Sequence, residues 1–309
     1  MRLPAGFAAY AARGPAFDDF LAALPGVVDG LVEEWRLTVD LPAGAEPAHG
    51  YCALVVPVRT AGGAPAVLKV GFPHEEAEQE HLALRHWDGR GAVRLLRADP
   101  HRHALLLERL HREDLGDLWD VEACEVVAGL YGALHVPAPA SVRRLATYAE
   151  GWAAGLRALP RDAPLPRRLV EQAASLAADL AAAPVDGGDR LLHGDLHYAN
   201  VLAASRAPWL AIDPKPLAGD PHSEVAPLLW NRWEELLGAH RSVRDGIRLR
   251  FHTVVDAAGL EEERARDWVV VRALTNALGR LQDEPGAVRQ TPTDAYLTQC
   301  VTLAKAVQG

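Results

Sequence analysis

A short polar segment between two apolar runs most constrains how this chain of 309 residues can fold. Residues 193–200 read His-Gly-Asp-Leu-His-Tyr-Ala-Asn, with Leu191 and Leu192 before them and the apolar run 201–204 after them. Short apolar runs on both sides of a polar loop are typical of strands. The sequence therefore predicts a loop held by two strands, in which Asp195 and Asn200 are fixed five residues apart.

The spacing of Asp195 and Asn200 suits phosphoryl transfer. His-x-Asp-Leu-x-x-x-Asn is the catalytic-loop pattern of phosphoryl-transfer enzymes, in which the Asp meets the incoming hydroxyl and the Asn binds Mg²⁺. A second apolar run, residues 209–212, ends at Asp213, where kinases place another Mg²⁺ ligand. We expect Asp195 to orient the acceptor hydroxyl and take its proton, and Asn200 and Asp213 to hold Mg²⁺.

Two other interpretations of the loop residues stay open. His193, Asp195 and His197 could be zinc ligands, since His and carboxylate at short spacing is a common metal pattern. That interpretation leaves Asn200 and Asp213 without roles. His193 by itself is more simply interpreted as a buried imidazole that hydrogen-bonds the backbone of the loop.

The pattern of apolar residues divides the chain into a strand-rich part and a helical part. In residues 1–110, helical spacing of aromatic residues near the start predicts short helices, and the expected strands are 35–39, 53–58, 66–70, 93–96 and 104–108, with a helix at 75–87. In residues 111–309 the expected helices are 121–135, 145–159, 165–182, 224–237, 243–258, 261–281 and 293–307. We expect an α+β chain with a mostly β lobe at 1–110 and a helical lobe at 111–309.

The chain resembles the aminoglycoside phosphotransferases, and within them the branch of streptomycin 6-kinases and hydroxyurea-type resistance kinases. The motifs that carry the resemblance are residues 193–197 with Asn200, 211–216, 219–221, 67–70, Trp87 and 105–110. They follow the family's order over nearly the whole chain. The resemblance implies a bilobal protein-kinase-like fold, ATP and Mg²⁺ as cofactors, and a small-molecule hydroxyl acceptor.

Lys69 is the expected phosphate-binding residue of the first lobe. It lies inside the apolar run 67–70, and in kinases such a Lys contacts the α- and β-phosphates and pairs with a Glu on the next helix. Glu76 and Glu80 lie one helical turn apart, so either could be that partner. Glu80 is preferred, because residues 80–85 look most like the family's Glu-x-x-Ala-Leu-Arg segment.

Two further contacts with the nucleotide are implied by the resemblance. Gly50 lies between the first strands, where kinases place a glycine-rich turn over the phosphates; an ordinary hairpin turn is an open alternative. Residues 107–110, with Glu108 and Leu110, occupy the place of the hinge whose backbone reads the purine edge. Backbone recognition leaves no side-chain signature, so ATP is expected and GTP is not excluded.

The acceptor side offers only general candidates. Asp220 is expected to be structural, as a cap of the following helix. Candidates for contact with a cationic sugar are acidic and aromatic residues of the helical lobe, namely Glu224, Trp230, Trp233, Glu234, Asp283 and Glu284. Aromatic residues at such positions are more often core, and charged residues more often form a solvated face.

Charge and composition exclude several classes of partner. The formal net charge of −9 argues against a nucleic-acid partner, because phosphate binding needs a basic face. No apolar run approaches the ~18 residues of a membrane span, and the first residues lack the pattern of a signal peptide. Cys52, Cys124 and Cys300 are widely spaced and are expected to be reduced. Together these features predict a cytoplasmic protein without a membrane partner.

The leading hypothesis is an ATP-dependent O-phosphotransferase that modifies an aminoglycoside such as streptomycin at its 6-position and confers resistance. A kinase of the same fold that acts on hydroxyurea, an amino sugar or another metabolite is the first alternative. A nucleotide-binding pseudokinase is a more remote alternative, because a binding module has no use for Asp195. The sequence does not identify the acceptor or the oligomeric state.

Overall fold

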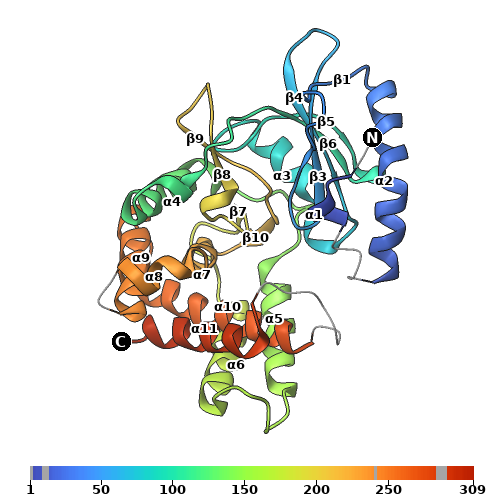
Figure 1. Ribbon diagram of the computed structural model, residues 1–309. Coiled ribbons are helices and arrows are strands. Elements are labelled where there is room, and N and C mark those ends of the chain that lie inside the picture. Colours follow the sequence, from blue (N-terminus) through green and yellow to red (C-terminus); the bar gives the residue numbers. More distant parts are fainter. Residues whose placement is uncertain (1–2, 9–13, 240–241, 283–290) are drawn as a thin grey trace. The chain divides into compact units, whose positions relative to one another are not determined.

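The computed structural model describes residues 3–8, 14–239, 242–282 and 291–309. The chain divides into two compact units, of which the first ends at His111 and the second begins at Arg112 (Figure 1). Strands dominate the first unit and helices the second, which confirms the expected α+β class. The functions assigned from sequence to residues 1–110 and 111–309 stay predictions.

An antiparallel sheet forms the frame of the first unit. Its strands are β1 (Thr38–Val39), β2 (Ala48–His49), β3 (Ala53–Arg59), β4 (Pro65–Gly71), β5 (Leu95–Asp99) and β6 (Ala104–Glu108). They lie in the order β1-β3-β4-β6-β5, and β2 pairs with β3. The short helices of this unit are α1 (Ala5–Ala8), η2 (Glu75–Ala77), α3 (Glu80–Trp87) and η3 (Pro100–Arg102).

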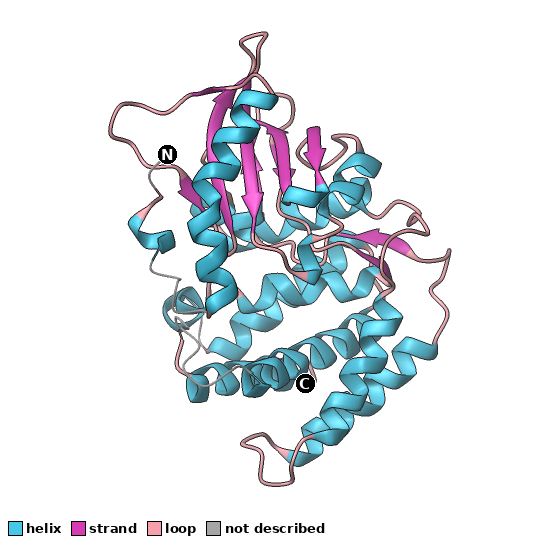
Figure 2. Cartoon of the chain, turned by 90° about the vertical axis from the view of Figure 1, so that its right-hand side faces the viewer, coloured by secondary structure: helices cyan, strands magenta, loops and turns pink. Residues whose placement is uncertain are grey.

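One long helix, α2 (Pro15–Glu34), covers a face of this sheet (Figure 2). Its buried side chains recur every three or four residues and pack against the inward-facing side chains of β3 and β4 in one core. The short helices expected near the start of the chain are therefore wrong at residues 15–34, which form one long helix. Tyr10, one of the aromatic residues on which that expectation rests, lies outside the described residues. Burial of this continuous stripe keeps the helix intact through Pro25, which removes a backbone hydrogen bond.

Two other expectations for the first unit need correction. The strand expected at residues 35–39 is only β1, because Trp35 ends α2 and Arg36 adopts a left-handed conformation with φ of 53°. The helix expected at residues 75–87 begins with the separate turn η2, and α3 starts at Glu80. Glu76 and Glu80 are therefore not one turn apart on a continuous α-helix.

The second unit consists mainly of helices, most of them within a few residues of the expected bounds. They are α4 (Asp120–Leu134), α5 (Leu145–Ala158), α6 (Arg167–Ala182), α7 (Val225–Trp230), α8 (Trp233–Ala239), α9 (Val243–Ala258), α10 (Glu262–Gln282) and α11 (Thr293–Ala306), with the 3-10 turns η4 (Leu115–Asp117), η5 (Tyr198–Asn200) and η6 (Pro221–Glu224). The helix expected at 224–237 is broken, because Arg232 has a positive φ of 52° between α7 and α8.

Two short antiparallel ladders interrupt these helices and carry the loop of the sequence motif. Strand β7 (Arg190–Leu192) pairs with β10 (Leu217–Gly219), and β8 (Val201–Ala203) pairs with β9 (Trp209–Ala211). The predicted strand–loop–strand arrangement around residues 193–200 is therefore present. The two ladders place the end of β7, the start of β8 and the end of β9 together.

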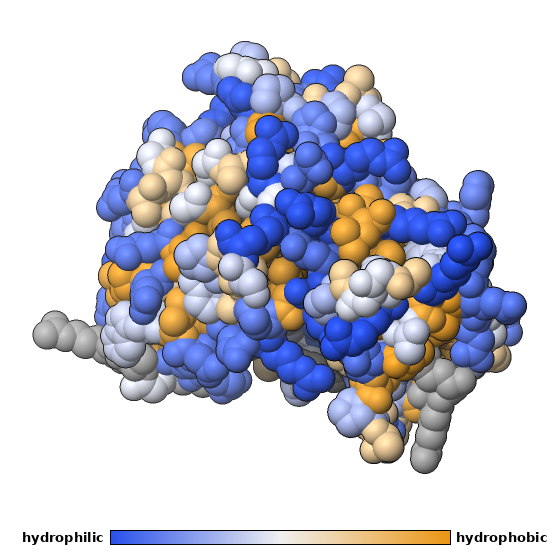
Figure 3. Space-filling model, turned by 90° about the horizontal axis from the view of Figure 1, so that it is seen from above, coloured by the Kyte–Doolittle hydropathy of each residue, from blue (hydrophilic) through white to orange (hydrophobic). Residues whose placement is uncertain are grey.

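No helix in the described part of the chain is long and apolar enough to cross a membrane. Hydrophilic and hydrophobic residues are intermixed on the face that Figure 3 shows. The large hydrophobic side chains exposed on the described surface are Val39, Tyr51, Leu96, Trp119 and Leu249. Isolated exposed apolar residues of this kind are normal for a folded protein.

Candidate active site

The two ladders bring Asp195, Asn200 and Asp213 into one region of the second unit. Asp195 lies in the loop after β7, and Asn200 immediately precedes β8. The register pairs Val201 with Ala211, and the amide of Ile212 donates to the carbonyl of Asn200 at 2.9 Å. Asp213 follows directly, so the structure brings together the three residues that the motif predicts.

The side chain of Asn200 is held in one orientation by two contacts. Its Nδ2 donates to the carbonyl oxygen of Asp195 at 2.8 Å and lies 3.2 Å from His197 Nε2. Burial lowers the pKa of His197 to about 4, so at neutral pH its ring is uncharged and Nε2 can accept. Both contacts use the amide nitrogen, and among the described residues no donor contacts Asn200 Oδ1. That oxygen is thus oriented as an acceptor or a metal ligand.

Asp213 combines an unusual backbone conformation with a charged neighbour. Its φ is 56°, a left-handed conformation that short Asx side chains tolerate better than most. Lys215 Nζ lies 2.9 Å from Asp213 Oδ2. The sequence analysis missed Lys215, although its position two residues after a metal-ligand candidate was the available signal. A carboxylate and an amide oxygen form the kind of ligand set that Mg²⁺ prefers.

Glu224 lies beneath the catalytic loop rather than on an acceptor surface. Its carboxylate is 1% exposed and accepts the backbone amides of His193 at 2.8 Å and Gly194 at 2.6 Å. Burial tends to raise the pKa of Glu224, but contacts with His135 and these amides outweigh that effect and lower it. The expected contact of Glu224 with the acceptor is contradicted by this burial.

His193 contributes a neutral imidazole to the same loop, as the simpler interpretation of the sequence predicts. Its Nε2 lies 2.9 Å from the carbonyl oxygen of Ile212, and the amide of Asp195 lies 3.4 Å from its Nδ1. Only the tautomer with the proton on Nε2 satisfies both contacts. Burial lowers the pKa of His193 to about 4. Because its two nitrogens contact Ile212 and Asp195, His193 is not available as a zinc ligand.

Gly194 is required by both its conformation and its surroundings. Its φ is +80°, and a Cβ at this position would lie 2.1 Å from the carbonyl oxygen of Lys215. The amide of Lys215 in turn donates to the carbonyl of His193 at 2.7 Å. This close approach of two backbone segments fixes the turn that presents Asp195, whose side chain is 34% exposed.

Asp220 has the structural role that the sequence predicts. It caps η6 by accepting the amide of His222 at 3.1 Å and also accepts Trp268 Nε1 at 2.6 Å and Arg264 Nε. Burial acts to raise the pKa of Asp220, but hydrogen bonds from His222, Trp268 and Arg264 outweigh it and lower the pKa to about 2. This capped turn leads into Glu224 and so supports the loop indirectly.

In the first unit, Lys69 and Glu80 form the predicted ion pair. Alternation along β4 buries Ala66, Leu68 and Val70 in the core under α2 and turns Lys69 to the opposite face. Lys69 Nζ lies 2.7 Å from both carboxylate oxygens of Glu80, at side-chain exposures of 12% and 5%. The partner is therefore Glu80 rather than Glu76.

The other nucleotide-contact candidates of this unit are ordinary in geometry. The amide of Gly50 donates to the carbonyl of Ala53 at 2.9 Å in the turn after β2. Glu108 ends β6, and both its amide and its carboxylate contact the backbone of Arg94. The amide of Glu108 is thus not available for a purine, which contradicts that part of the hinge expectation. A backbone contact at Leu110 stays a prediction.

The remaining acceptor candidates lie around the break between α7 and α8. Trp230 and Trp233 are half-buried and Glu234 is exposed, whereas Asp283 and Glu284 lie outside the described residues. Arg272 of α10, which the sequence analysis missed, contacts this region: its guanidinium carbon lies 5.7 Å from the Trp230 ring centroid and 5.5 Å from that of Trp152. Its Nη2 also donates to the carbonyl of Gly194 at 3.3 Å.

Comparison with known proteins extends this description. Residues 36–283 match the family of aminoglycoside/hydroxyurea antibiotic resistance kinases. The chain is 42% identical to a streptomycin 6-kinase of Streptomyces glaucescens, covering 100% of this chain and 98% of that one. It is 45% identical to a hydroxyurea phosphotransferase of Kitasatospora aureofaciens, covering 87% of this chain and 77% of that one. A solved amicoumacin kinase, in complex with AMP-PNP and Ca²⁺, has a TM-score of 0.61 at 12% identity, covering 89% and 91% of the two chains.

The fold and the loop of residues 193–200 define a small-molecule kinase with a protein-kinase-like fold. Within that class, the chain belongs to the family of aminoglycoside/hydroxyurea antibiotic resistance kinases. The family resemblance seen in the sequence motifs is therefore confirmed.

The close approach at Gly194 can be tested with a matched pair of variants. Gly188→Ala places an alanine at φ +82° with nothing near its Cβ and should cost about 1–2 kcal/mol of unfolding free energy. Gly194→Ala adds the clash with Lys215 and should cost at least ~2 kcal/mol more. Urea unfolding measures both, and equal losses in the two variants would contradict the close approach.

The pKa of His193 predicts an acid-sensitive fold. Because burial lowers its pKa from 6.5 to about 4, the unfolded chain binds this proton more readily. The contribution is fully present above pH 6.5 and is lost as the pH falls toward 4, by on the order of 3 kcal/mol. Urea unfolding over this range should show a shallower loss for His193→Gln than for the parent. The exposed His101→Gln is the control, and an equal slope in all three proteins would contradict the assignment.

Proposed function

We propose that this protein transfers the γ-phosphate of Mg-ATP to a hydroxyl of streptomycin or a close aminoglycoside relative, at the 6-position, and thereby confers resistance. The observation that carries this proposal is the arrangement of Asp195, Asn200 and Asp213, in which one loop supplies both a carboxylate for the acceptor and an oriented amide oxygen for the metal. The 42% identity to a streptomycin 6-kinase over the full chain supports the choice of acceptor.

The residues fit a divalent cation of the Mg²⁺ type. Asn200 Oδ1 and the Asp213 carboxylate are hard oxygen ligands on two adjoining segments, and Lys215 already balances the charge of Asp213. When bound, Mg²⁺ neutralises charge that develops on the phosphate oxygens. Lys69, held by Glu80, would contact the α- and β-phosphates. ATP is the proposed donor, and the backbone around Leu110 would recognise the purine, with GTP as the alternative.

Asp195 would act on the acceptor by orientation more than by basicity. The loose transition state of phosphoryl transfer requires little proton removal early in the reaction, so the carboxylate mainly holds the hydroxyl in line with the phosphorus. The proton then passes to the Asp195 carboxylate as the new O–P bond forms. The anchoring of His193 and Gly194 by Glu224 supplies the rigidity that such positioning needs.

We include a cationic acceptor and a cytoplasmic location in the proposal. The net charge of −9 favours a cation over an anion and disfavours nucleic acid. ATP supply and the thiols of Cys52, Cys124 and Cys300, which are not joined in disulfides, both suit the cytoplasm. Trp230, Trp233 and Glu234, near the break between α7 and α8, are the proposed acceptor contacts.

Hydroxyurea is the second candidate acceptor, because the chain is 45% identical to a hydroxyurea phosphotransferase. A pseudokinase function is disfavoured, since a module that only binds nucleotide needs neither the loop carboxylate of Asp195 nor its buried supports. Another kinase substrate, such as an amino sugar, would leave the same nucleotide residues in place and differ only in the acceptor contacts.

An acceptor panel tests the proposal directly. The protein is incubated with Mg-ATP and separately with streptomycin, other aminoglycosides, hydroxyurea or amino sugars, and products are analysed by mass spectrometry. We expect a phosphate mass gain on streptomycin, with a KM that rises with ionic strength because salt screens the attraction of a polycation. Product only from hydroxyurea, with a KM insensitive to salt, would favour the second candidate, and no product from any compound would contradict the proposal.

Two isosteric substitutions should impair phosphate transfer in different ways. Asp195→Asn removes the group that orients the hydroxyl, so kcat should fall by roughly 10²–10⁴-fold with nearly unchanged Mg-ATP affinity. Asp213→Asn removes a charged metal ligand and should weaken Mg-ATP binding as well as turnover. Calorimetric Mg-ATP titrations and single-turnover assays measure both effects.

The matched control is Asp294→Asn, an exposed carboxylate on α11. It should bind Mg-ATP and transfer phosphate as the parent does. The role assignments are lost if Asp195→Asn retains the parental rate, or if Asp213→Asn retains the parental Mg-ATP affinity.

A further inference from the structure

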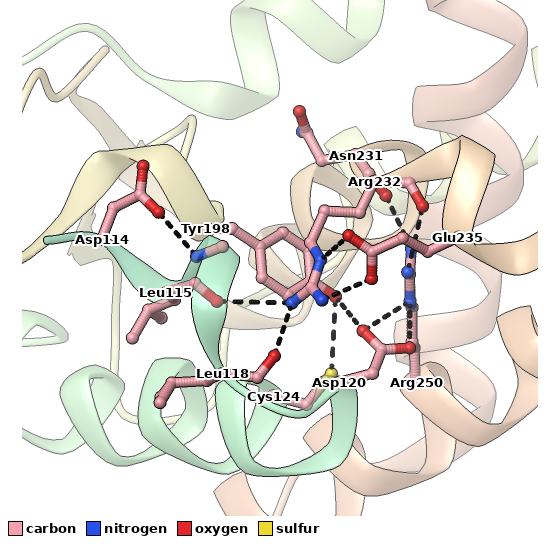
Figure 4. Close-up of polar contacts among 11 residues, drawn as sticks. Asp114, Leu115, Leu118, Asp120, Cys124, Tyr198, Asn231, Arg232, Glu235 and Arg250 are labelled. Atoms are coloured by element: carbon pink, nitrogen blue, oxygen red, sulfur yellow. Dashed lines mark hydrogen bonds and ion pairs between the residues drawn. The ribbon is translucent and has the colours of Figure 1, made fainter. Parts of the chain in front are cut away.

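Tyr198 lies inside the catalytic loop, three residues after Asp195 and two before Asn200, and has no role in the chemistry described above. It is 2% exposed, and its hydroxyl donates to Asp120 Oδ1 at 2.8 Å (Figure 4). Asp120 is the first residue of α4 and is distant from the loop in sequence. A long aromatic side chain therefore ties the middle of the loop to a helix behind it.

The group that holds the Tyr198 hydroxyl is itself fixed by a buried ion pair. Arg250 of α9 is 1% exposed, and its Nε lies 3.0 and 2.8 Å from the two carboxylate oxygens of Asp120. Its two terminal nitrogens donate to the carbonyls of Asn231 at 2.6 Å and Arg232 at 3.2 Å (Figure 4). All three nitrogens of the guanidinium thus donate to groups inside the protein. Because the two charges are buried together, moving either one would leave the other unpaired.

A second arginine holds the ring of Tyr198 from another side. The guanidinium carbon of Arg232 lies 4.7 Å from the ring centroid, and its Nη1 donates to the carbonyls of Leu115 at 3.3 Å and Leu118 at 3.1 Å. Arg232 also pairs with Glu235 of α8, as Figure 4 shows. The ring is thus held by its face as well as by its hydroxyl, and the contacts come from η4, α4, α9 and the α7–α8 connection.

Between Asp195 and Asn200 the loop also buries Leu196, which is 0% exposed, and it contains two local hydrogen bonds. The backbone hydrogen bond within it joins the amide of Asn200 to the carbonyl of His197 at 2.9 Å, and the side chain of Asn200 bonds back to Asp195. Both contacts lie inside the loop and move with it. The hydroxyl of Tyr198, in contrast, joins the loop to residues that belong to the helical frame.

We propose that Tyr198 is a positioning residue for phosphoryl transfer. Its hydroxyl is hydrogen-bonded to the Asp120–Arg250 ion pair and keeps the loop in the conformer that presents both Asp195 and Asn200. This inference rests on the proposed kinase function. It assigns a function to the buried ion pair of Asp120 and Arg250.

The physical consequence is a change in the population of the competent loop. When only a fraction of the molecules holds the competent conformer, apparent affinity and turnover fall by that fraction. Loss of a buried hydrogen bond to a charged group is large enough to lower that population about tenfold. The acceptor contacts proposed near α7 and α8 do not bond to the hydroxyl of Tyr198, so KM for the acceptor should change less than kcat.

Tyr198→Phe removes the hydroxyl and keeps the ring that Arg232 covers. We expect kcat to fall about tenfold and Mg-ATP affinity to fall several-fold, with a smaller change in KM for the acceptor. Cys124→Ala, which removes a sulfur 3.9 Å from the same hydroxyl, should behave like the parent because it leaves the bond to Asp120 intact. Assays are run at a temperature where circular dichroism shows every variant fully folded.

A second control separates positioning from general stability. Val307→Ala removes a buried side chain at the end of α11, outside the network, and should lower the melting temperature without the loss of kcat. The inference is overturned if Tyr198→Phe keeps the parental kcat and Mg-ATP affinity, or if Val307→Ala loses as much kcat for the same fall in melting temperature. If the parent modifies no acceptor, the proposed function fails, and the Mg-ATP affinity of Tyr198→Phe alone then decides the inference.

Discussion

The loop of residues 193–200 depends on the hydrogen bonds that the buried carboxylate of Glu224 accepts. A carboxylate that is almost fully removed from water is unfavourable unless hydrogen bonds satisfy it. The amides of His193 and Gly194 provide those bonds, and this pairs the start of the loop with the end of η6. Because β7 enters the loop on one side and Asp220 caps η6 on the other, the turn before Asp195 is defined from both directions.

The charged groups on both units are paired in advance of any ligand. Lys69 is held by Glu80, and Asp213 by Lys215, so under the proposed function neither a phosphate nor a metal would meet an isolated charge. A prepared pair lowers the reorganisation that binding requires, which is the same principle by which fixed dipoles stabilise a transition state. The cost is that each ligand must exchange one favourable contact for another, and Asp213 additionally retains a left-handed backbone conformation.

The sequence predicts the parts of this site that are local in the chain. Asp195, Asn200 and Asp213 lie close together in the chain. Strand alternation and the following helix limit the partner of Lys69 to Glu76 or Glu80, and the family resemblance favours Glu80, which the structure confirms. The supports could not be predicted, because their contacts join distant segments: Gly194 to Arg272 across 78 residues, and Asp120 to Arg250 across 130. Glu224 was assigned to the acceptor for the same reason, since nothing in its local sequence reveals two backbone amides from the loop.

Errors in the predicted fold have a similar origin. The continuous α2 depends on a sheet that covers its apolar stripe, and the break at Arg232 depends on a positive φ that a non-glycine residue accepts because Leu115, Leu118 and Tyr198 hold its side chain. Local preference alone favours continuing a helix through an arginine. Tertiary contacts decide both cases, and they also place Trp233 and Glu234 on a new helix.

Local charge has more influence on the acceptor than the net charge of the chain. Charges farther away than the Debye length of about 8 Å are largely screened at physiological ionic strength, so the net charge of −9 favours a cation only weakly at any one site. The guanidinium of Arg272, by contrast, donates to the carbonyl of Gly194 and covers Trp152 and Trp230. Under the proposed function, a polycationic acceptor that reaches Asp195 would therefore direct its charged groups away from Arg272. A small neutral acceptor would meet no such requirement, so Arg272 would affect the two proposed classes of substrate differently.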